Sequence, residues 1–98
     1  MSLIHYEKDF KGLIKEKAVV DFYATWCGPC KMFGPIFEEV SEKESINFIK
    51  LDVDKHPEIA REYGVMTIPT IILFNNGKEV KRYTGFMSKD ELIKFINE

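Results

Sequence analysis

Hydrophobic and polar positions follow two different periods along this chain. Residues 17–23 and 46–53 are short apolar runs rich in β-branched and aromatic side chains, which predicts strands buried on both faces. Between these runs, apolar residues recur at the i, i+3, i+4, i+7 spacing of an amphipathic helix: Phe33, Ile36, Phe37 and Val40. The period therefore changes from strand to helix and back to strand.

Weaker patterns predict the elements on either side of this unit. A short strand is expected near Leu3 and Ile4. A helix is expected to follow, with these apolar positions: Phe10, Leu13 and Ile14. A further short helix is expected over residues 57–63, and Gly64 is expected to end it.

The C-terminal third of the chain predicts a hairpin followed by a helix. Residues 70–74 and 79–83 flank the turn Asn75-Asn76-Gly77, which is typical of a β-hairpin. Ser88 and Glu91 form a Ser-x-x-Glu capping box, so a last helix is expected to begin there. Its expected buried positions are Leu92, Phe95 and Ile96.

Strand and helix therefore follow the order β-α-β-α-β-α-β-β-α. Strands joined through helices by right-handed crossovers are expected to lie parallel, and the hairpin is expected to add an antiparallel edge. The expected fold class is α/β, with a central mixed β-sheet of parallel strands plus a C-terminal antiparallel hairpin, flanked by helices on both faces.

Length and composition indicate one compact domain over residues 1–98. The chain has 98 residues, of which 45% are hydrophobic and 31% charged, enough for a single core. Its 14 Lys and Arg against 16 Asp and Glu leave a net charge of -2 without a basic stripe, so no nucleic acid partner is expected. The longest apolar run, residues 68–74, is too short to cross a membrane. No secretory signal opens the chain, so a cytoplasmic location is expected.

Both cysteines lie within the stretch ATWCGPCK, residues 24–31. Cys27 and Cys30 follow a predicted strand at its carboxyl end and open a predicted helix, where open α/β sheets usually carry their sites. Residues three apart in a first helical turn are close enough for a disulfide, and the unpaired amides and positive dipole end favour a thiolate. Pro29 suits a first turn because the N–H that it lacks would have no helical partner. The spacing therefore predicts an activated dithiol that can close.

Two other uses of the cysteine pair have weaker support. A zinc site needs four ligands, and the remaining candidates, His5 and His56, lie apart from each other and from the pair. A purely structural bridge across two residues would restrain little of the unfolded chain. We therefore expect redox chemistry and no metal.

Three segments resemble the thioredoxin family over essentially the whole chain. They are VVDFYATWCGPCKMFGPIFEEV (residues 19–40), FIKLDVDKHPEIAREYGVMTIPTIILFNNGKEVKRYTGF (residues 48–86) and the final helix. Trp-Cys-Gly-Pro-Cys-Lys is highly specific to that family, and Ile68-Pro69-Thr70 is a second match. The chain departs from the family at Tyr23, where many members carry Trp, and in its slightly short start. Neither departure is expected to affect the chemistry.

The resemblance implies the thioredoxin fold and a cytosolic protein-disulfide reductase. Such a protein reduces the disulfides of oxidised protein substrates by dithiol–disulfide exchange and maintains the redox balance of the cell. It binds no cofactor of its own, and a thioredoxin reductase that draws on NADPH recharges it. The resemblance also implies a monomer without a membrane partner.

The resemblance gives four residues a chemical role. Cys27 is the nucleophile that forms a mixed disulfide, and Cys30 is the thiol that resolves it. Asp21 matches the family's buried aspartate and is expected to accept the proton of Cys30; a carboxylate at a strand end that reaches solvent is the alternative. Lys50 matches a lysine near that aspartate, and the alternative is a lysine whose stem is buried and whose ammonium reaches water.

Four further residues are expected to bind substrate. Trp26 offers a flat apolar surface to a partner, and packing in the core is the alternative. Ile68-Pro69 resembles the family's cis peptide bond facing the disulfide, where the preceding backbone would pair with an extended substrate segment. Gly85 matches a glycine that lets the partner's backbone approach closely, and a plain turn glycine is the alternative.

Two other functions are compatible with this fold. Disulfide oxidases and isomerases typically carry His between their cysteines and act in oxidising compartments. Gly28 and Pro29 place no such charge beside Cys27, which favours a reductant. A binding module or assembly subunit would use the same surface for docking, and intact cysteines do not exclude it. Turnover of a protein disulfide would distinguish the reductase from the module.

Overall fold

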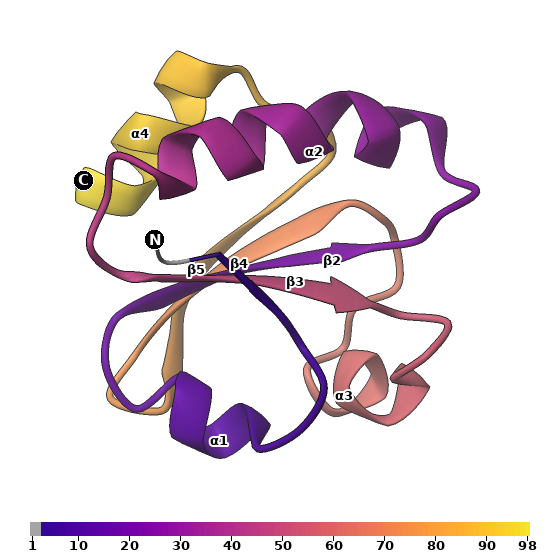
Figure 1. The fold of residues 1–98 in the computed structure, drawn as a ribbon. Helices are drawn as coiled ribbons and strands as arrows, with labels where there is room; N and C mark the ends of the chain where they lie inside the picture. The colour runs from indigo at the N-terminus through magenta and orange to yellow at the C-terminus, as the bar shows by residue number, and fades with distance from the viewer. Residues whose placement is uncertain (1–2) are drawn as a thin grey trace.

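The computed structural model describes residues 3–98 of the chain. Strands and helices follow one another in the order that the hydrophobic pattern predicts (Figure 1). Their bounds are β1 Leu3–His5, α1 Phe10–Leu13, β2 Ala18–Tyr23, α2 Gly28–Ser41, β3 Asn47–Asp52, α3 Pro57–Glu62, β4 Thr70–Asn75, β5 Lys78–Thr84 and α4 Lys89–Asn97.

The strands form one mixed sheet in the order β1-β3-β2-β4-β5. β1 and β2 lie parallel to β3, whereas β4 lies antiparallel to both β2 and β5. Helices flank the sheet, and the β4–β5 hairpin forms its C-terminal side. The expected fold class is therefore confirmed.

The direction of β4 differs from the expectation for a strand reached through a helix. β4 follows α3, yet it runs antiparallel to β2. Tyr23 pairs with Asp52 at the end of β3, while Phe22 pairs with Thr70 at the start of β4, so β3 ends where β4 begins. A helix of 6 residues rises only about 9 Å, too little to return the chain to the opposite end of the sheet.

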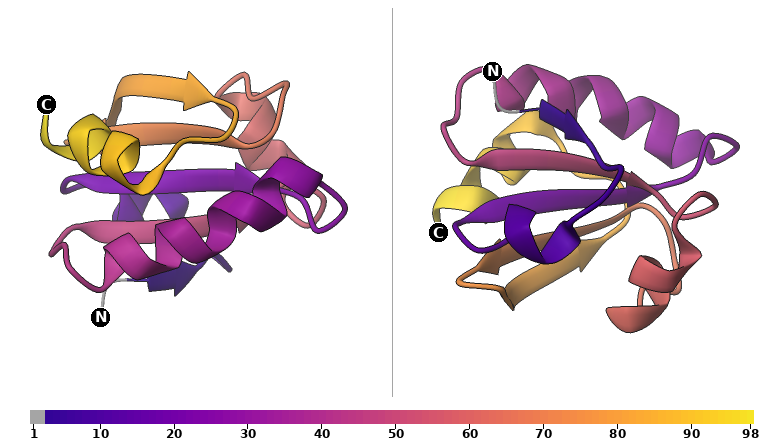
Figure 2. Two further views of the ribbon diagram at one scale, coloured as in Figure 1. Left: turned by 90° about the horizontal axis from the view of Figure 1, so that it is seen from above. Right: turned by 60° about the horizontal axis from the view of Figure 1, so that its bottom comes forward.

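Helices cover both faces of the sheet. α2 and α4 lie on one face, and α1 and α3 lie on the other (Figure 1). Seen from above, α2 crosses the sheet obliquely with α4 beside it, and in the second view α1 lies in front of the middle strands (Figure 2). Within residues 3–98, no helix is long and apolar enough to cross a bilayer.

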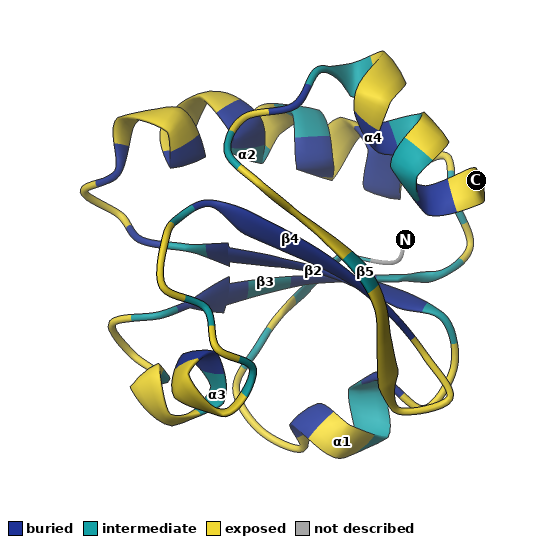
Figure 3. Ribbon diagram, turned by 180° about the vertical axis from the view of Figure 1, so that it is seen from behind, coloured by how far each residue is buried: buried dark blue, intermediate teal, exposed yellow. Residues whose placement is uncertain are grey.

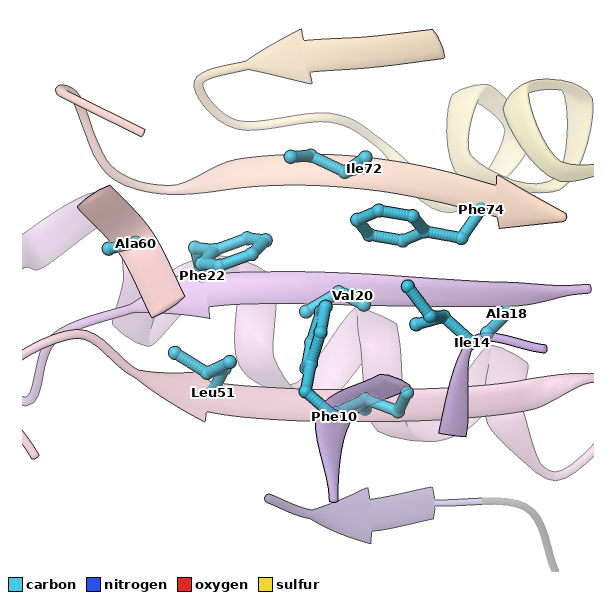
Figure 4. Close-up of a cluster of buried hydrophobic side chains, with 10 residues drawn as sticks. Phe10, Ile14, Ala18, Val20, Phe22, Leu51, Ala60, Ile72 and Phe74 are labelled. Atoms are coloured by element: carbon cyan, nitrogen blue, oxygen red, sulfur yellow. The ribbon is translucent and has the colours of Figure 1, made fainter. Parts of the chain in front are cut away.

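Two apolar clusters hold these layers together, one on each face of the sheet. The first packs α1 and α3 against the strands (Figure 4), and its members include Phe10, Val20, Phe22, Ile72 and Phe74. The second packs α2 and α4, and its members include Val19, Phe33, Phe37, Leu92 and Ile96. Successive strand residues join opposite clusters because side chains alternate between the two faces. The middle strands are therefore buried on both faces, while the outer helix faces stay exposed (Figure 3).

Local sequence signals shape the C-terminal elements as predicted. The Ser88 hydroxyl accepts a hydrogen bond from the Glu91 N–H at 3.1 Å, and the Glu91 carboxylate accepts one from the Ser88 N–H at 2.8 Å. This reciprocal capping box opens α4. Asn76 and Gly77 have φ angles of 57° and 78°, the left-handed conformation that a tight hairpin turn requires.

Candidate active site

The two cysteines lie at the amino end of α2, joined by a disulfide with their Cα atoms 5.2 Å apart. Cys27 is the N-cap residue of this 14-residue helix, and its Sγ accepts a hydrogen bond from the Cys30 N–H at 3.2 Å. Because that N–H is one of the first in the helix, it has no partner inside the helix. A thiolate on Cys27 would keep this hydrogen bond and gain from the positive end of the helix dipole.

The segment before β4 faces the disulfide from the other side. Ile68 packs against the cysteines, and its carbonyl oxygen lies 3.9 Å from Cys27 Sγ. The Ile68–Pro69 peptide bond is cis, as predicted. The Pro69 carbonyl accepts a hydrogen bond from the Gly85 N–H at 2.8 Å, which ties this segment to the end of β5. Gly85 has a φ of 104°, so a side chain at this position would strain the backbone.

Exposed apolar side chains lie near both ends of the site. Trp26, directly before Cys27, is 69% exposed, which excludes the alternative that it packs in the core. Met66, two residues before Ile68, is 93% exposed. The indole N–H of Trp26 donates a hydrogen bond to a carboxylate oxygen of Asp54 at 2.7 Å. Sequence reasoning did not identify Asp54, and the one signal that could have found it is its place just after β3, at the same end of the sheet as Trp26.

Asp21 lies in the middle of β2 and has no exposed surface. The alternative that its carboxylate reaches solvent is therefore wrong. Neither carboxylate oxygen accepts a hydrogen bond from any residue of 3–98. Desolvation by burial raises the pKa of Asp21 from 3.8 to about 7, against the opposing positive charge of Lys50. This carboxyl therefore gains or loses a proton near neutral pH.

Lys50 lies on β3, in register with Asp21 on β2. Its ammonium nitrogen lies 4.4 Å from the centre of the Tyr23 ring. It also lies under α2, since a Cβ atom added to Gly34 would come within 3.4 Å of it. Lys50 is half-buried, so its stem is covered between the sheet and α2 while part of the side chain reaches solvent.

A groove of about 390 Å³ runs along the side of α2 from the cysteines to β1. Its lining includes Cys30, Tyr23, Gly34, Lys50 and Glu38. Of the two cysteines, Cys30 lines this groove and Cys27 does not, so the groove places the resolving position beside Tyr23 and Lys50. In the described part of the chain, no group of three or more His, Cys, Asp or Glu side chains could hold a metal ion.

The thioredoxin family model matches residues 2–98 of this chain. The chain belongs to the thioredoxin family. It is 54% identical to a thioredoxin of Mycoplasmoides gallisepticum over 82 residues, which cover 83% of this chain and 82% of that protein. It is 48% identical to a bifunctional thioredoxin reductase/thioredoxin of Mycobacterium leprae, covering 82% of this chain and 18% of that protein. The structure resembles that of a reduced thioredoxin pre-protein of Schistosoma mansoni, with a TM-score of 0.88, 39% identity and coverage of 99% and 97%.

Family and geometry together establish the chemistry of the site. Thioredoxins are thiol–disulfide oxidoreductases, and this member carries their cysteine pair at the start of α2. The protein is therefore an oxidoreductase that works by dithiol–disulfide exchange through Cys27 and Cys30, as the sequence predicts. The structure also shows a contact that sequence reasoning missed, between the Tyr23 ring and the Lys50 ammonium.

Proposed function

We propose that this thioredoxin reduces the disulfides of oxidised proteins, with Cys27 as the attacking thiolate and Cys30 as the resolving thiol. The observation that carries this assignment is the hydrogen bond from the Cys30 N–H to Cys27 Sγ at 3.2 Å. It stabilises negative charge on Cys27 and not on Cys30. Exposure does not distinguish the two, since Cys27 is 5% and Cys30 4% exposed.

The proposed exchange has two steps. The Cys27 thiolate attacks one sulfur of the substrate disulfide, so that a Cys27–substrate disulfide forms and the other substrate sulfur leaves as a thiolate. Cys30 then loses its proton and attacks Cys27 Sγ, which forms the Cys27–Cys30 disulfide and releases the second substrate thiolate. The substrate gains two electrons, and the dithiol of the protein loses two.

Asp21 is the proposed acceptor for the proton of Cys30. Its support is burial on β2, the lack of a hydrogen-bond partner within residues 3–98, and a pKa raised to about 7 by desolvation. A base with a pKa near the working pH takes and returns a proton most effectively. Lys50, in register with Asp21, is proposed to moderate the pKa of that carboxyl with its positive charge.

The substrate is proposed to bind as an extended segment across the front of the disulfide. The exposed indole of Trp26 supplies apolar contact area. The backbone of Ile68, which precedes the cis proline Pro69, would pair with the segment, and Gly85 would let it approach closely because it carries no side chain. Gly28 and Pro29 add no charge next to the cysteines, which supports a reductant rather than an oxidase.

A thioredoxin reductase that draws on NADPH is proposed to restore the dithiol. The relative from Mycobacterium leprae supports this partnership, because its name joins a thioredoxin reductase to a thioredoxin. We further propose that the protein acts as a monomer, which leaves the surface around Trp26 free for substrates. A cytoplasmic location is proposed because thiols are kept reduced there.

Trapping experiments test the order of attack. Cys30→Ser should accumulate stable mixed disulfides through Cys27, which mass spectrometry of captured complexes would identify, while Cys27→Ser should capture none. Partners attached only through Cys30 in the Cys27→Ser variant would reverse the roles. Insulin reduction, with the double cysteine variant as its control, tests the reductase itself, because a pure docking module would show no turnover.

A further inference from the structure

We propose that Tyr23 is a positioning residue: its ring holds the Lys50 ammonium beside Asp21 and thereby sets the protonation of the base that serves Cys30. This inference rests on the proposed function, since it concerns how the resolving step is tuned. Tyr23 also packs against the cluster of Ala24, Cys27 and Cys30, but its proposed role acts through the Lys50 ammonium and not on a sulfur.

The geometry places the three groups in one corner of the sheet. Asp21 and Tyr23 are two residues apart on β2, so their side chains leave the same face of the sheet. Lys50 reaches this face from β3, in register with Asp21, and its ammonium lies 4.4 Å from the Tyr23 ring centre. An ammonium at this distance over an aromatic face is attracted by the ring quadrupole.

The long side chain of Lys50 needs such a restraint. Along the described chain, no hydrogen bond or ion pair is formed by its ammonium, and it borders a groove through which the ammonium can turn toward water. A free lysine side chain samples many rotamers, so its mean field at Asp21 depends on what holds it. The Tyr23 ring is the aromatic contact that holds it on the Asp21 side.

The ring stays neutral and available at working pH. Burial, with the negative charges of Asp52 and Asp21, raises the pKa of the Tyr23 phenol above its ordinary value of 10.0. The titratable groups around this corner include Lys50 and Asp52 from β3, Tyr23 from β2, and Cys27 and Cys30 at the start of α2. A neighbouring hollow, which Tyr23 and Lys50 also line, adds Tyr6, Glu7, Lys55 and His56. The groove adds His5 from β1, with Lys31 and Glu38 from α2. β4 pairs with Asp21 through apolar Ile71.

The sign of the effect separates this role from simple packing. If the Tyr23 ring holds the Lys50 ammonium, removing the ring lets the ammonium move away from Asp21, and the pKa of Asp21 should rise. If the ring only keeps water away, its removal should hydrate Asp21, and the pKa should fall. The two accounts predict opposite shifts.

The experiment is an NMR titration of the Asp21 carboxyl carbon in the oxidised protein, where the cysteines do not titrate. Tyr23→Leu should raise the pKa of Asp21 by about 0.5 or more. Tyr23→Phe and Tyr23→Trp keep a ring and should leave it near the wild-type value. In a Lys50→Met background, where the pKa is already raised, Tyr23→Leu should raise it no further.

Other outcomes overturn the proposal. A lower pKa in Tyr23→Leu, or the same rise with and without Lys50, would show that the ring does not act through the ammonium. A measurement on the unaltered protein guards against a variant that fails to fold: the ε-methylene protons of Lys50 should be shifted upfield by the Tyr23 ring current. Unshifted protons would also contradict the contact.

Activity separates this proposal from the proposed function. Wild type and Tyr23→Leu, both with Cys27 and Cys30 intact, are loaded with a substrate as a mixed disulfide, and the rate of its resolution is measured against pH. The midpoint of this pH–rate profile should move to higher pH in Tyr23→Leu, together with the pKa of Asp21. If Tyr23→Leu shifts the pKa of Asp21 but the wild type does not reduce insulin, the proposed reductase function is refuted and the positioning role of Tyr23 stands. If the wild type reduces insulin but the pKa of Asp21 is unchanged in Tyr23→Leu, only the positioning role is refuted.

Discussion

The indole N–H of Trp26 and the carboxylate of Asp54 are joined by a hydrogen bond of 2.7 Å across the active-site end of the sheet. Trp26 comes from the loop after β2, and Asp54 from the loop after β3, which lie side by side because β2 and β3 are parallel neighbours. The bond fixes the plane of an exposed ring beside Cys27. A ring held in place loses less conformational entropy when a partner docks on it.

Removal of this bond should weaken the binding of protein substrates while leaving the reactivity of the disulfide intact. For Asp54→Ala, we expect KM for insulin to rise about fivefold, which corresponds to roughly 1 kcal/mol for one partly solvated hydrogen bond. The reduction of a small aromatic disulfide, which needs no docking surface, should keep its rate. Asp54→Asn retains an acceptor oxygen and is the matched control. An equal loss with both substrates would show that Asp54 acts on the sulfurs instead.

The hydrophobic pattern was sufficient to predict the elements and the place of the cysteines. Continuous apolar runs indicate strands that are buried on both faces, and the helical spacing indicates which side of a helix is buried; that information is local. The direction of β4 was not predicted, because it depends on how far the six residues of α3 can carry the chain across the sheet. The face of the sheet on which Asp21 lies follows from the alternation of side chains along β2. That Lys50 of β3 lies next to it does not follow from the pattern, because it depends on the register of the two strands.

Contacts through space were the part that the sequence did not reveal. Asp54 and Trp26 are 28 positions apart, and no spacing rule joins an indole to a carboxylate. Tyr23 was expected to be neutral for the chemistry, since a change between aromatic residues keeps the pattern unchanged. Its contact with Lys50 is visible only once β2 and β3 are in register.

The buried carboxyl of Asp21 should make stability fall as pH rises. Below about pH 4, the group is protonated in both folded and unfolded chains and contributes no difference. Between about pH 4 and 7, the unfolded chain loses the proton while the folded chain keeps it, because the folded pKa is about 7. The free energy of unfolding should therefore decrease through this window, by about 4 kcal/mol at most, and level off above it.

Urea unfolding of the oxidised protein between pH 4 and 8 would measure this effect. The informative quantity is the difference between wild type and Asp21→Asn, since the other ionisable groups cancel in it. At neutral pH, Asp21→Asn should be the more stable protein, because no charge remains to be desolvated. A difference that does not vary with pH would mean that Asp21 carries no raised pKa.

Arg82 should contribute to stability by joining the edge strand β5 to the end of α3. Its guanidinium donates to the Tyr63 carbonyl at 2.6 Å and to the Gly64 carbonyl at 3.4 Å, and it pairs with both carboxylate oxygens of Glu79 at 2.6 and 2.7 Å. These carbonyls follow the last turn of α3, where they lack helical donors. We expect Arg82→Ala to cost about 1 to 2 kcal/mol, a fall in Tm of roughly 5–10 °C.

Calorimetry of Arg82 and Glu79 variants would show which contacts of Arg82 account for the loss of stability. Glu79→Gln keeps the side-chain shape and removes the ion pair, and it should lower Tm by less than half as much as Arg82→Ala, since the carbonyl contacts remain. Arg82→Lys cannot reproduce the fork of donors and should fall in between. Equal effects of Glu79→Gln and Arg82→Ala would assign the stabilisation to the ion pair alone.

The two residues between the cysteines should decide whether the pair acts as a reductant or an oxidant. Cys27 Sγ already receives the Cys30 N–H and the positive end of α2, and Gly28 and Pro29 add no charge. A Cβ atom at Gly28 would meet no atom within 4 Å, so the surface here has room for a larger neighbour. In Pro29→His, a partly protonated imidazole would stabilise the thiolate, lower the pKa of the attacking thiol and favour the reduced form.

Equilibration with glutathione buffers, read by gel shift after alkylation, would give the potential. Pro29→His should be more oxidising than wild type by roughly 30 mV or more, a tenfold change in the equilibrium constant. Pro29→Gln removes the proline without adding a charge, and it should account for less than half of that change. The gap between the two variants should also shrink as pH rises and the imidazole loses its proton. If Pro29→His made the pair more reducing, or if Pro29→Gln matched it at every pH, charge beside Cys27 would not control the potential, and the reductase assignment would lose the support of Gly28 and Pro29.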